Sequence, residues 1–451
     1  MRGPAEPLPI LLVVLDGLAD RPYPELGGMT PLEAAHTPVM DRLAADGQSG
    51  FHYPLGPGRV PSMELVHWRF LGYEAHPFCG RACLEALGEG VPCEPGDVFA
   101  FLALRRVARR KDGAYRVVGG YGEEFADAAG GYERLDGWTD APTGYRFEVF
   151  PLGRGEAVLR LPRGGLSVSP SGDVTDSDPF FFTDLPVLRP QPTASAADPA
   201  AAAATARALA RFLGRAAEVF DHGSGPERLV VHKWTGTFRP VPAFRELTGA
   251  DGAVVASSRL MRGLARAFGL AFVEHPEGKA AEGLADKLES ALDLLFPEEG
   301  EYGAAFAHVH TKAADEAAHA GDPREKAAVI EDLDRGLRAL LEIAPEELVL
   351  CVTADHATPV GGRTVHWGDS VPVLLGGPHV RVDEVGFFDE RSAVGGGLGQ
   401  IEASDLLPYL LCQAERAHFM GARPLPVPPL GVPHRAEPWR HEPSPERAPR
   451  P

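Results

Sequence analysis

Cysteine is scarce in this chain, with five residues in a length of 451. The number is odd and no pair has zinc-finger spacing, which argues against a disulfide-stapled scaffold and against a cysteine-based zinc module. Sparse, reduced thiols are typical of proteins that work in the cytoplasm. We therefore expect a cytoplasmic protein with free thiols at Cys79, Cys83, Cys93, Cys351 and Cys412.

The chain also lacks a long apolar run and an excess of positive charge. The N-terminal run PILLVVL at 9–15 is too short to span a membrane, and no small-residue cleavage site stands before Asp16. Acidic residues outnumber basic ones by 63 to 44, which gives a formal net charge of −19. Such a surface repels nucleic acids and anionic membranes, so we expect neither as a partner. An anionic substrate stays open, because bound divalent cations reverse the potential inside a cleft.

The apolar segments predict an α/β fold. Short runs rich in branched side chains alternate with helical stretches, which indicates a mostly parallel sheet with helices on both faces. The expected strands are 9–15, 228–232, 252–256, 304–310, 347–353 and 371–375, and the expected helices are 259–268, 283–296, 323–343 and 402–411.

The length exceeds what one compact core usually holds, so we expect a second domain. Residues 76–225 are rich in glycine and proline and contain an alanine-rich stretch, 194–210, that predicts a helix. We interpret this region as a cap domain inserted into a core formed by 8–75 and 226–415. The Pro- and Arg-rich tail at 424–451 is expected to be disordered.

Three local patterns carry residues that bind metals. Asp16 directly follows the first apolar run, and Asp355 with His356 follows the run at 347–353. Asp315 and His319 are four residues apart, so on a helix they share one face and can bind one ion. The carboxyl ends of parallel strands meet at one edge of a sheet. We expect the candidate ligands to converge there: Asp16, Asp315, His319, Asp355, His356 and His366.

Each of these residues also has an ordinary structural interpretation. A strand-end aspartate is more often a helix cap or a turn residue, and a lone histidine is usually a surface or core residue. For the six candidate ligands together, spacing alone leaves metal binding and ordinary structural roles equally open. Mixed aspartate and histidine ligation suits Mn²⁺ or Zn²⁺, and two such ions about 3.5–4 Å apart clamp a transferring phosphoryl group.

Read in order, the motifs resemble the archaeal-type cofactor-independent phosphoglycerate mutases of the alkaline phosphatase superfamily. The similar segments include LLVVLDGLADRPYPELGGMTPLEAAHTPVMDRLAADGQSG at 11–50, HVHTKAADEAAHAGD at 308–322 and VTADHATPVGGRTVHWGDSVPVLLGG at 352–377. The resemblance runs from 8 to 411, is strong in the core and is patchy in the cap. It implies an alkaline phosphatase-like core, two divalent ions and a small phosphorylated acid or alcohol as substrate.

The resemblance also implies roles for individual residues. One ion would bind Asp315, His319 and His366. The other would bind Asp16, Asp355 and His356, and in the family the nucleophilic hydroxyl completes this site. Lys312 matches a lysine near the transferred phosphate, and its alternative is a solvated surface lysine. Arg81 resembles a substrate-binding arginine, although it could equally pair with a neighbouring carboxylate.

The nucleophile position departs from the family pattern. Aligned on His67 and the following LGY, the family's serine or threonine falls on Met63, and Ser62 stands one place earlier. A thioether forms no phosphoenzyme and is a poor ligand for hard cations. Three interpretations stay open: Ser62 replaces the missing hydroxyl, a metal-bound hydroxide attacks directly and makes the protein a phosphohydrolase, or the transfer chemistry is lost.

The cap departs as well, because the Arg-rich phrase that follows PGDV in the family is absent. The basic segment RRVARRK at 105–111 is read as a solvated strand or turn rather than an anion site, so the substrate need not be phosphoglycerate. The leading hypothesis is a metal-dependent mutase or phosphatase, with Ser62, Lys312 and Arg81 in catalytic roles. Its rival is a non-catalytic, metal- or ligand-binding member of the same fold, which Met63 favours and the retained ligand set opposes.

Overall fold

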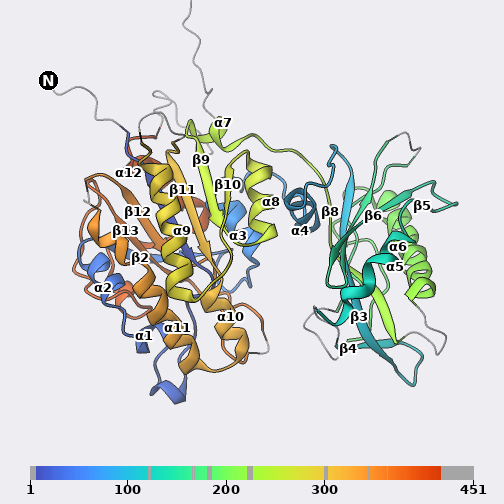
Figure 1. Cartoon of the computed structure of the whole chain (residues 1–451), viewed down its shortest axis with the longest axis horizontal. Helices are drawn as coiled ribbons and strands as arrows, with labels where there is room; N and C mark the ends of the chain where they lie inside the picture. The colour runs from blue at the N-terminus through green and yellow to red at the C-terminus, as the bar shows by residue number, and fades with distance from the viewer. Residues whose placement is uncertain are drawn as a thin grey trace, which may run out of the picture.

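The computed structural model describes residues 7–119, 123–164, 166, 168–179, 185–220, 227–298, 303–343, 346–362 and 364–417. The expected disordered tail at 424–451 lies outside this part of the chain. Two sheets dominate the described residues, one of eight strands and one of six. Figure 1 shows them as two lobes side by side, with helix α4 (Arg81–Gly88) between them.

The eight-stranded sheet contains the first apolar run at its centre. Its order is β10-β9-β11-β1-β12-β13-β2-β14, and β1 pairs in parallel with both β11 and β12. Every other pairing in this sheet that does not involve β13 is likewise parallel, which confirms the mostly parallel α/β fold. The strands are β1 (Ile10–Leu15), β2 (Gln48–Tyr53), β9 (Gly252–Ala256), β10 (Ala271–Glu274), β11 (Phe306–Thr311), β12 (Val349–Thr353), β13 (Val371–Gly376) and β14 (Gly399–Glu402).

Helices cover both faces of this sheet. Successive side chains of β1 point to opposite faces, and all of them are apolar and buried, so both faces need a cover. Leu12 and Val14 pack in one apolar cluster with α3 (Met63–Phe70), α8 (Arg259–Phe268) and α12 (Ala403–Gln413). Leu11 and Val13 pack on the opposite face with α2 (Pro38–Ala45), α9 (Ala280–Leu295) and α11 (Pro323–Gly336). A strand buried on both faces reads as a continuous apolar run, which is why β1 shows no polar alternation.

The second sheet has the order β4-β3-β7-β6-β5, and β8 pairs with β3. Helix α6 (Pro199–Phe220), which contains most of the alanine-rich stretch, packs on it through Leu209 and Phe212. The strands are β3 (Val98–Arg109), β4 (Tyr115–Gly119), β5 (Trp138–Thr139), β6 (Arg146–Gly153), β7 (Glu156–Leu161) and β8 (Arg228–Thr237).

Two strand expectations are wrong in their pairing. The strand predicted at 228–232 does not join the parallel core, because β8 pairs antiparallel with β3 in the second sheet. The strand predicted at 371–375 lies in the core but runs antiparallel to both of its neighbours, β12 and β2. Apolar runs of this kind record burial on two faces and carry no information about which strand lies alongside.

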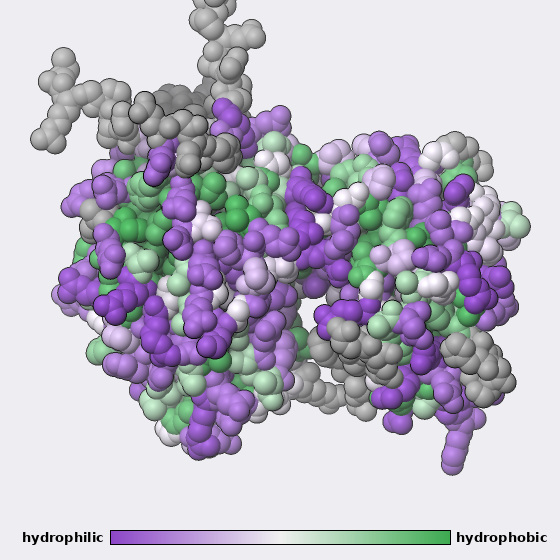
Figure 2. All heavy atoms as spheres, in the orientation of Figure 1, coloured by the Kyte–Doolittle hydropathy of each residue, from purple (hydrophilic) through white to green (hydrophobic). Residues whose placement is uncertain are grey.

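The remaining helices are short and mostly flank the sheets. No helix among the described residues is long and apolar enough to cross a membrane. Figure 2 shows hydrophilic side chains over most of this face of both lobes. These helices are η1 (Pro24–Leu26), α1 (Pro31–Ala34), η2 (Glu123–Ala128), α5 (Ala129–Glu133), α7 (Phe244–Thr248), α10 (Ala313–Ala320), η3 (Arg338–Glu342) and η4 (Ser392–Gly395).

Candidate metal centre

Three adjacent parallel strands deliver polar side chains to one edge of the core sheet. Strand β1 ends just before Asp16, β12 ends two residues before Asp355, and β11 leads through Lys312 into helix α10. Asp16, Asp355 and His356 are fully buried. This is the edge where ligands bind in open parallel sheets, and the sequence-predicted residues do meet there.

Asp16, Asp355 and His356 form one compact group. The Nε2 atom of His356 lies 3.3 Å from Oδ1 of Asp16 and 3.4 Å from Oδ2 of Asp355. All three side chains offer ligand atoms within 4.8 Å of one another. The group therefore has the size of a single cation site.

A second group adjoins the first and shares His356 with it. Asp315, His356 and His366 bring ligand atoms within 4.8 Å of one another. His319 lies outside that group of three, yet its Nε2 is 3.4 Å from Oδ2 of Asp315, while Nε2 of His366 is 4.0 Å from Oδ1. The rings of His356 and His366 stack with centroids 3.7 Å apart. The six predicted ligands thus occupy one continuous cluster.

Neighbouring groups fix which imidazole nitrogen faces the carboxylates. The Thr358 hydroxyl donates to Oδ1 of Asp315 at 2.8 Å, so it accepts from Nδ1 of His356, 3.1 Å away. Nδ1 of His366 donates to the carbonyl of Pro61 at 2.8 Å. Because both Nδ1 atoms carry the proton, both Nε2 atoms present a lone pair, as metal ligation requires.

Two carboxylates of this cluster, those of Asp16 and Asp355, have oxygens that no protein group compensates among the described residues. Among the described residues, neither Asp16 oxygen nor Oδ2 of Asp355 accepts a hydrogen bond. Burial, and then the charges of Asp355 and Asp315, raise the pKa of Asp16 well above its usual value. Burial and the charge of Asp315 raise the pKa of Asp355 to about 7. Buried like charges with orphaned oxygens are costly, and divalent cations remove that cost, so these residues fit metal ions.

The imidazole of His356 fits the same role. Burial, followed by the charge of His366, lowers the pKa of His356 to about 3. The ring is therefore neutral across the physiological range, which is the form that binds a metal. Its Nε2 has no hydrogen-bond partner in the described part of the chain.

Ser62 lies beside this cluster on the loop that leads into helix α3. The preceding carbonyl, that of Pro61, accepts from His366, and the following carbonyl, that of Met63, accepts from Nδ1 of His67 at 2.9 Å. The Ser62 side chain makes no capping hydrogen bond to the helix, and the Met63 side chain is buried in the apolar core. The backbone therefore binds two imidazoles on either side of the hydroxyl.

Lys312 lies at the N-terminus of helix α10, and its positive charge acts on the pKa of Asp16 against the effect of burial. Arg81 is engaged elsewhere. Its guanidinium lies 3.4 Å from Glu64 and 3.3 Å from Glu85, and it sits over the ring of Trp234 at 4.0 Å. The alternative pairing with carboxylates is therefore observed. Arg81 also lines a cavity of about 310 Å³ between the start of α4 and β8.

Sequence reasoning missed three residues of the cluster. Thr358 orients two ligands, and its hydroxyl gives no sequence signal. His67 and His310, both fully buried, form a further group with Asp355 whose ligand atoms lie within 4.8 Å. The signal for His310 was available, because a histidine inside a fully buried strand needs a partner.

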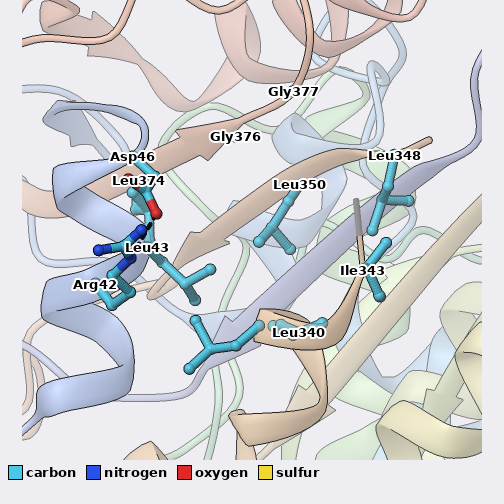
Figure 3. Close-up of a pocket in the computed structure, with 11 residues that line it drawn as sticks. Arg42, Leu43, Asp46, Leu340, Ile343, Leu348, Leu350, Leu374, Gly376 and Gly377 are labelled. Carbon is cyan, nitrogen blue, oxygen red and sulfur yellow. Dashed lines mark ion pairs between the residues drawn. The ribbon is translucent and has the colours of Figure 1, made fainter. Parts of the chain in front are cut away.

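A separate hollow lies between η3, α2 and the end of β13 (Figure 3). Its walls are largely leucine and isoleucine, and its charged residues, Arg42 and Asp46, pair with each other. None of the predicted ligands lines it. This apolar hollow is therefore separate from the candidate metal centre.

Comparisons with known proteins show which family the chain belongs to. The family model of the metalloenzyme superfamily matches residues 8–412. A 2,3-bisphosphoglycerate-independent phosphoglycerate mutase from Methanopyrus kandleri is 38% identical over 436 residues, covering 92% of this chain and 98% of the relative. Phosphoglycerate mutase 2 from Methanocaldococcus jannaschii is 31% identical over 431 residues, covering 92% and 95%.

Solved structures give the same result. A Pyrococcus horikoshii protein superposes with a TM-score of 0.73 at 27% identity, covering 93% of this chain and all of its own. The cofactor-independent phosphoglycerate mutase of Thermoplasma acidophilum gives 0.58 at 27% identity, covering 90% and 99%. Relatives named as mutases argue against the non-catalytic alternative. The chain belongs to the archaeal-type 2,3-bisphosphoglycerate-independent phosphoglycerate mutases of the metalloenzyme superfamily, and it is an enzyme of that kind.

Proposed function

We propose that this enzyme transfers the phosphoryl group of a small phosphorylated acid or alcohol, in the manner of a phosphoglycerate mutase, with two divalent ions. Asp315, His319 and His366 would hold one ion. Asp16, Asp355 and His356 would hold the other. The observation that carries the proposal is the buried set of carboxylate oxygens and imidazole nitrogens that lack partners in the described chain. The mixture of oxygen and nitrogen ligands favours Mn²⁺ or Zn²⁺.

The other side chains take roles around the phosphoryl group. Ions bound here would supply electrostatic stabilisation of the transferring group, usually the largest catalytic contribution. Lys312 would neutralise a phosphate oxygen. Arg81, held near the junction of the lobes, would bind the remainder of the substrate after exchanging one of its carboxylate partners. We further propose residues 76–225 as the substrate-holding cap and, from the free thiols, the cytoplasm as the place of action.

We propose Ser62 as the nucleophile in place of the family hydroxyl. Its oxygen would attack phosphorus while the bond to the substrate oxygen breaks, and the resulting phosphoserine would return the group to a second hydroxyl. The position of Ser62 between two carbonyls that bind His366 and His67 supports this role. The buried Met63 supports the second candidate, a phosphohydrolase that uses a metal-activated water.

The overall proposal is tested by turnover. Protein loaded with Mn²⁺ or Zn²⁺ is assayed on phosphomonoesters that include 3-phosphoglycerate, together with Asp355→Ala and the exposed control Asp286→Ala. We expect turnover in wild type and the control, and a loss on the order of 10²–10³ in Asp355→Ala. Absence of turnover on every ester, with unchanged metal binding in Asp355→Ala, would end the proposal.

The nucleophile is tested by phosphate capture. Acid-quenched intact mass after incubation with 3-phosphoglycerate should show one added phosphate in wild type and in the exposed-serine control Ser195→Ala. Ser62→Ala should show none, and its mutase activity should fall. Undiminished phosphate release by Ser62→Ala without an adduct would instead establish the hydrolase.

A further inference from the structure

Lys326, on helix α11, is a fully buried lysine beside the loops that lead away from the candidate metal centre. Its Nζ donates to the carbonyls of Ala19 and Thr358 at 3.1 and 2.9 Å, and to Oδ2 of Asp20 at 2.9 Å. An ammonium group has three donors, so all of them are used. Lysine is almost never fully buried unless it is paired, and this one needs a reason to lie inside the core.

The two carbonyls belong to the two loops that carry candidate metal ligands. Ala19 comes three residues after Asp16. Thr358 comes two residues after His356. The loops meet at this point, because the amide of Thr358 donates to the carbonyl of Ala19 at 3.0 Å. The ammonium adds a second link across the same pair of segments, so it holds the loop after β1 and the loop after β12 in one relation.

Helix α11 connects the ammonium to the second group of ligands as well. Helix α10 carries Asp315 and His319, and α11 begins after only two further residues and packs against it. The Thr358 hydroxyl bridges the two ligand groups, since it donates to Asp315 and accepts from His356. Lys326 therefore lies where three ligand-bearing segments meet.

A second buried lysine provides a comparison. Lys287, on helix α9, is equally buried, and its Nζ donates to Glu277 at 2.7 Å. Removal of either lysine leaves a carboxylate without its cationic partner, which destabilises a fold. In the described part of the chain, only Lys326 of these two also donates to carbonyls of the ligand-bearing loops. Stability alone therefore does not account for the contacts of Lys326.

We propose that Lys326 is a positioning residue of the candidate metal centre. Its ammonium ties the two strand-end loops together and thereby places Thr358, which orients Asp315 and His356. This inference rests on the metal binding proposed above. Without the ammonium, the Thr358 carbonyl loses a buried donor, and its hydroxyl no longer has a set position between the two ligands. Groups that orient metal ligands from behind typically contribute about 10–100-fold to metal affinity.

The test measures the affinity of metal-depleted, full-length protein for Mn²⁺ by isothermal titration calorimetry. Lys326→Met keeps a straight apolar side chain and removes the ammonium, and Lys287→Met is the matched control. Both variants should unfold at lower urea concentration than wild type, since each leaves a carboxylate without its partner. Only Lys326→Met should bind Mn²⁺ more weakly, by about 10–100-fold. Equal affinity in Lys326→Met and wild type, or an equal loss in both lysine variants, overturns the inference.

A double variant tests whether Lys326 acts through Thr358. Thr358→Val removes the hydroxyl, and it should also weaken Mn²⁺ binding. If the lysine acts through this hydroxyl, adding Lys326→Met to Thr358→Val should weaken binding much less than Lys326→Met does in wild type. Losses that multiply in full would show that the two residues act independently, and would refute the proposed route.

Asp355→Ala separates this inference from the proposed function. If Asp355→Ala binds Mn²⁺ as wild type does, the metal centre itself is wrong. If it loses Mn²⁺ while Lys326→Met binds normally, only the positioning role is refuted.

Lys326→Arg covers the case in which the methionine variant does not fold. Arginine keeps a charged donor for Asp20, but its planar fork does not match the three acceptors of an ammonium, so the same weakening of Mn²⁺ binding is expected. Wild-type affinity in Lys326→Arg would then overturn the inference. Failure of both variants to fold would show that the lysine is needed for the whole fold, and would refute a local role.

Discussion

A methionine at position 63 alters more than the nucleophile. Its side chain is buried in an apolar cluster that includes Trp68, so the thioether stabilises the start of helix α3 and offers no hydroxyl to the candidate metal-binding residues. Its carbonyl fixes the tautomer of His67. A serine at position 63 would both begin the helix and supply a hydroxyl. Here Met63 begins the helix, and the hydroxyl belongs to Ser62, one residue earlier.

Buried neutral histidines make stability depend on acidity. His232, in the second sheet, is fully buried with Nδ1 2.9 Å from the Ser177 hydroxyl, and burial lowers its pKa to about 4. The unfolded chain takes up a proton near pH 6.5, but the folded chain takes it up only near pH 4. The neutral imidazole of His232 therefore contributes roughly 3 kcal/mol to the free energy of unfolding above pH 6.5. This contribution is lost as the pH falls from 6.5 to about 4.

We therefore expect His232→Gln to flatten part of the acid dependence of folding. The free energy of unfolding in urea is measured at pH 7, 5.5 and 4.5 for wild type, for His232→Gln and for the exposed control His379→Gln. Wild type and the control should lose more stability on acidification than His232→Gln. Parallel curves for all three proteins would contradict the assignment.

At the scale of elements, the sequence predicted where strands and helices occur better than it predicted which strands pair with one another. The run at 9–15 became β1, and the helix expected at 259–268 has those bounds in the structure. The antiparallel direction of β13 and the place of β8 in the second sheet were not predictable, because strand partners depend on distant segments. Likewise, strand ends indicated Asp16 and Asp355. Thr358 needed coordinates, since its hydroxyl contacts Asp315 and His356 only in the folded chain.

At the junction of the two lobes, strand β8 approaches the start of helix α4 closely because both segments have a glycine there. A Cβ atom on Gly236 of β8 would overlap the carbonyl of Cys79 and the Cα of Gly80, which precedes Arg81. Trp234, two residues before Gly236, has a positive φ of 58°, and its ring packs under Arg81. Separating β8 from α4 would therefore displace the arginine that we assign to the substrate.

Gly236→Ala should cost about 1–3 kcal/mol of unfolding free energy through overpacking and should raise KM more than it lowers kcat. Gly214→Ala, in helix α6 with open space around its Cα, is the matched control. It should stabilise the protein by about 0.5–1 kcal/mol, because alanine is the better helix former. Urea unfolding and steady-state kinetics check both. Equal free energies of unfolding for Gly236→Ala and wild type would contradict the predicted overpacking at the junction.

At the scale of the molecule, the proposed ligands come from distant parts of the chain. Asp16 follows the first strand, whereas His366 precedes β13 near the end of the described core. An unfolded chain does not hold these groups together, so ions that bind the cluster select the folded state. They also reduce the repulsion within a chain of net charge −19, and above all among its buried carboxylates.

Metal removal should therefore lower the thermal stability of the whole molecule. Ions at a hundred times their dissociation constant stabilise the folded state by about 2.7 kcal/mol per site. Thermal unfolding is followed by circular dichroism for chelator-treated protein, for the same protein reloaded with Zn²⁺ or Mn²⁺, and for Asp355→Ala treated alike. Tm should rise on reloading in wild type and much less in the variant, because only wild type keeps both sites. An equal rise in both proteins would mean that the ions act elsewhere on this acidic surface, and the cluster at the edge of the core sheet would then need another explanation for its orphaned carboxylates.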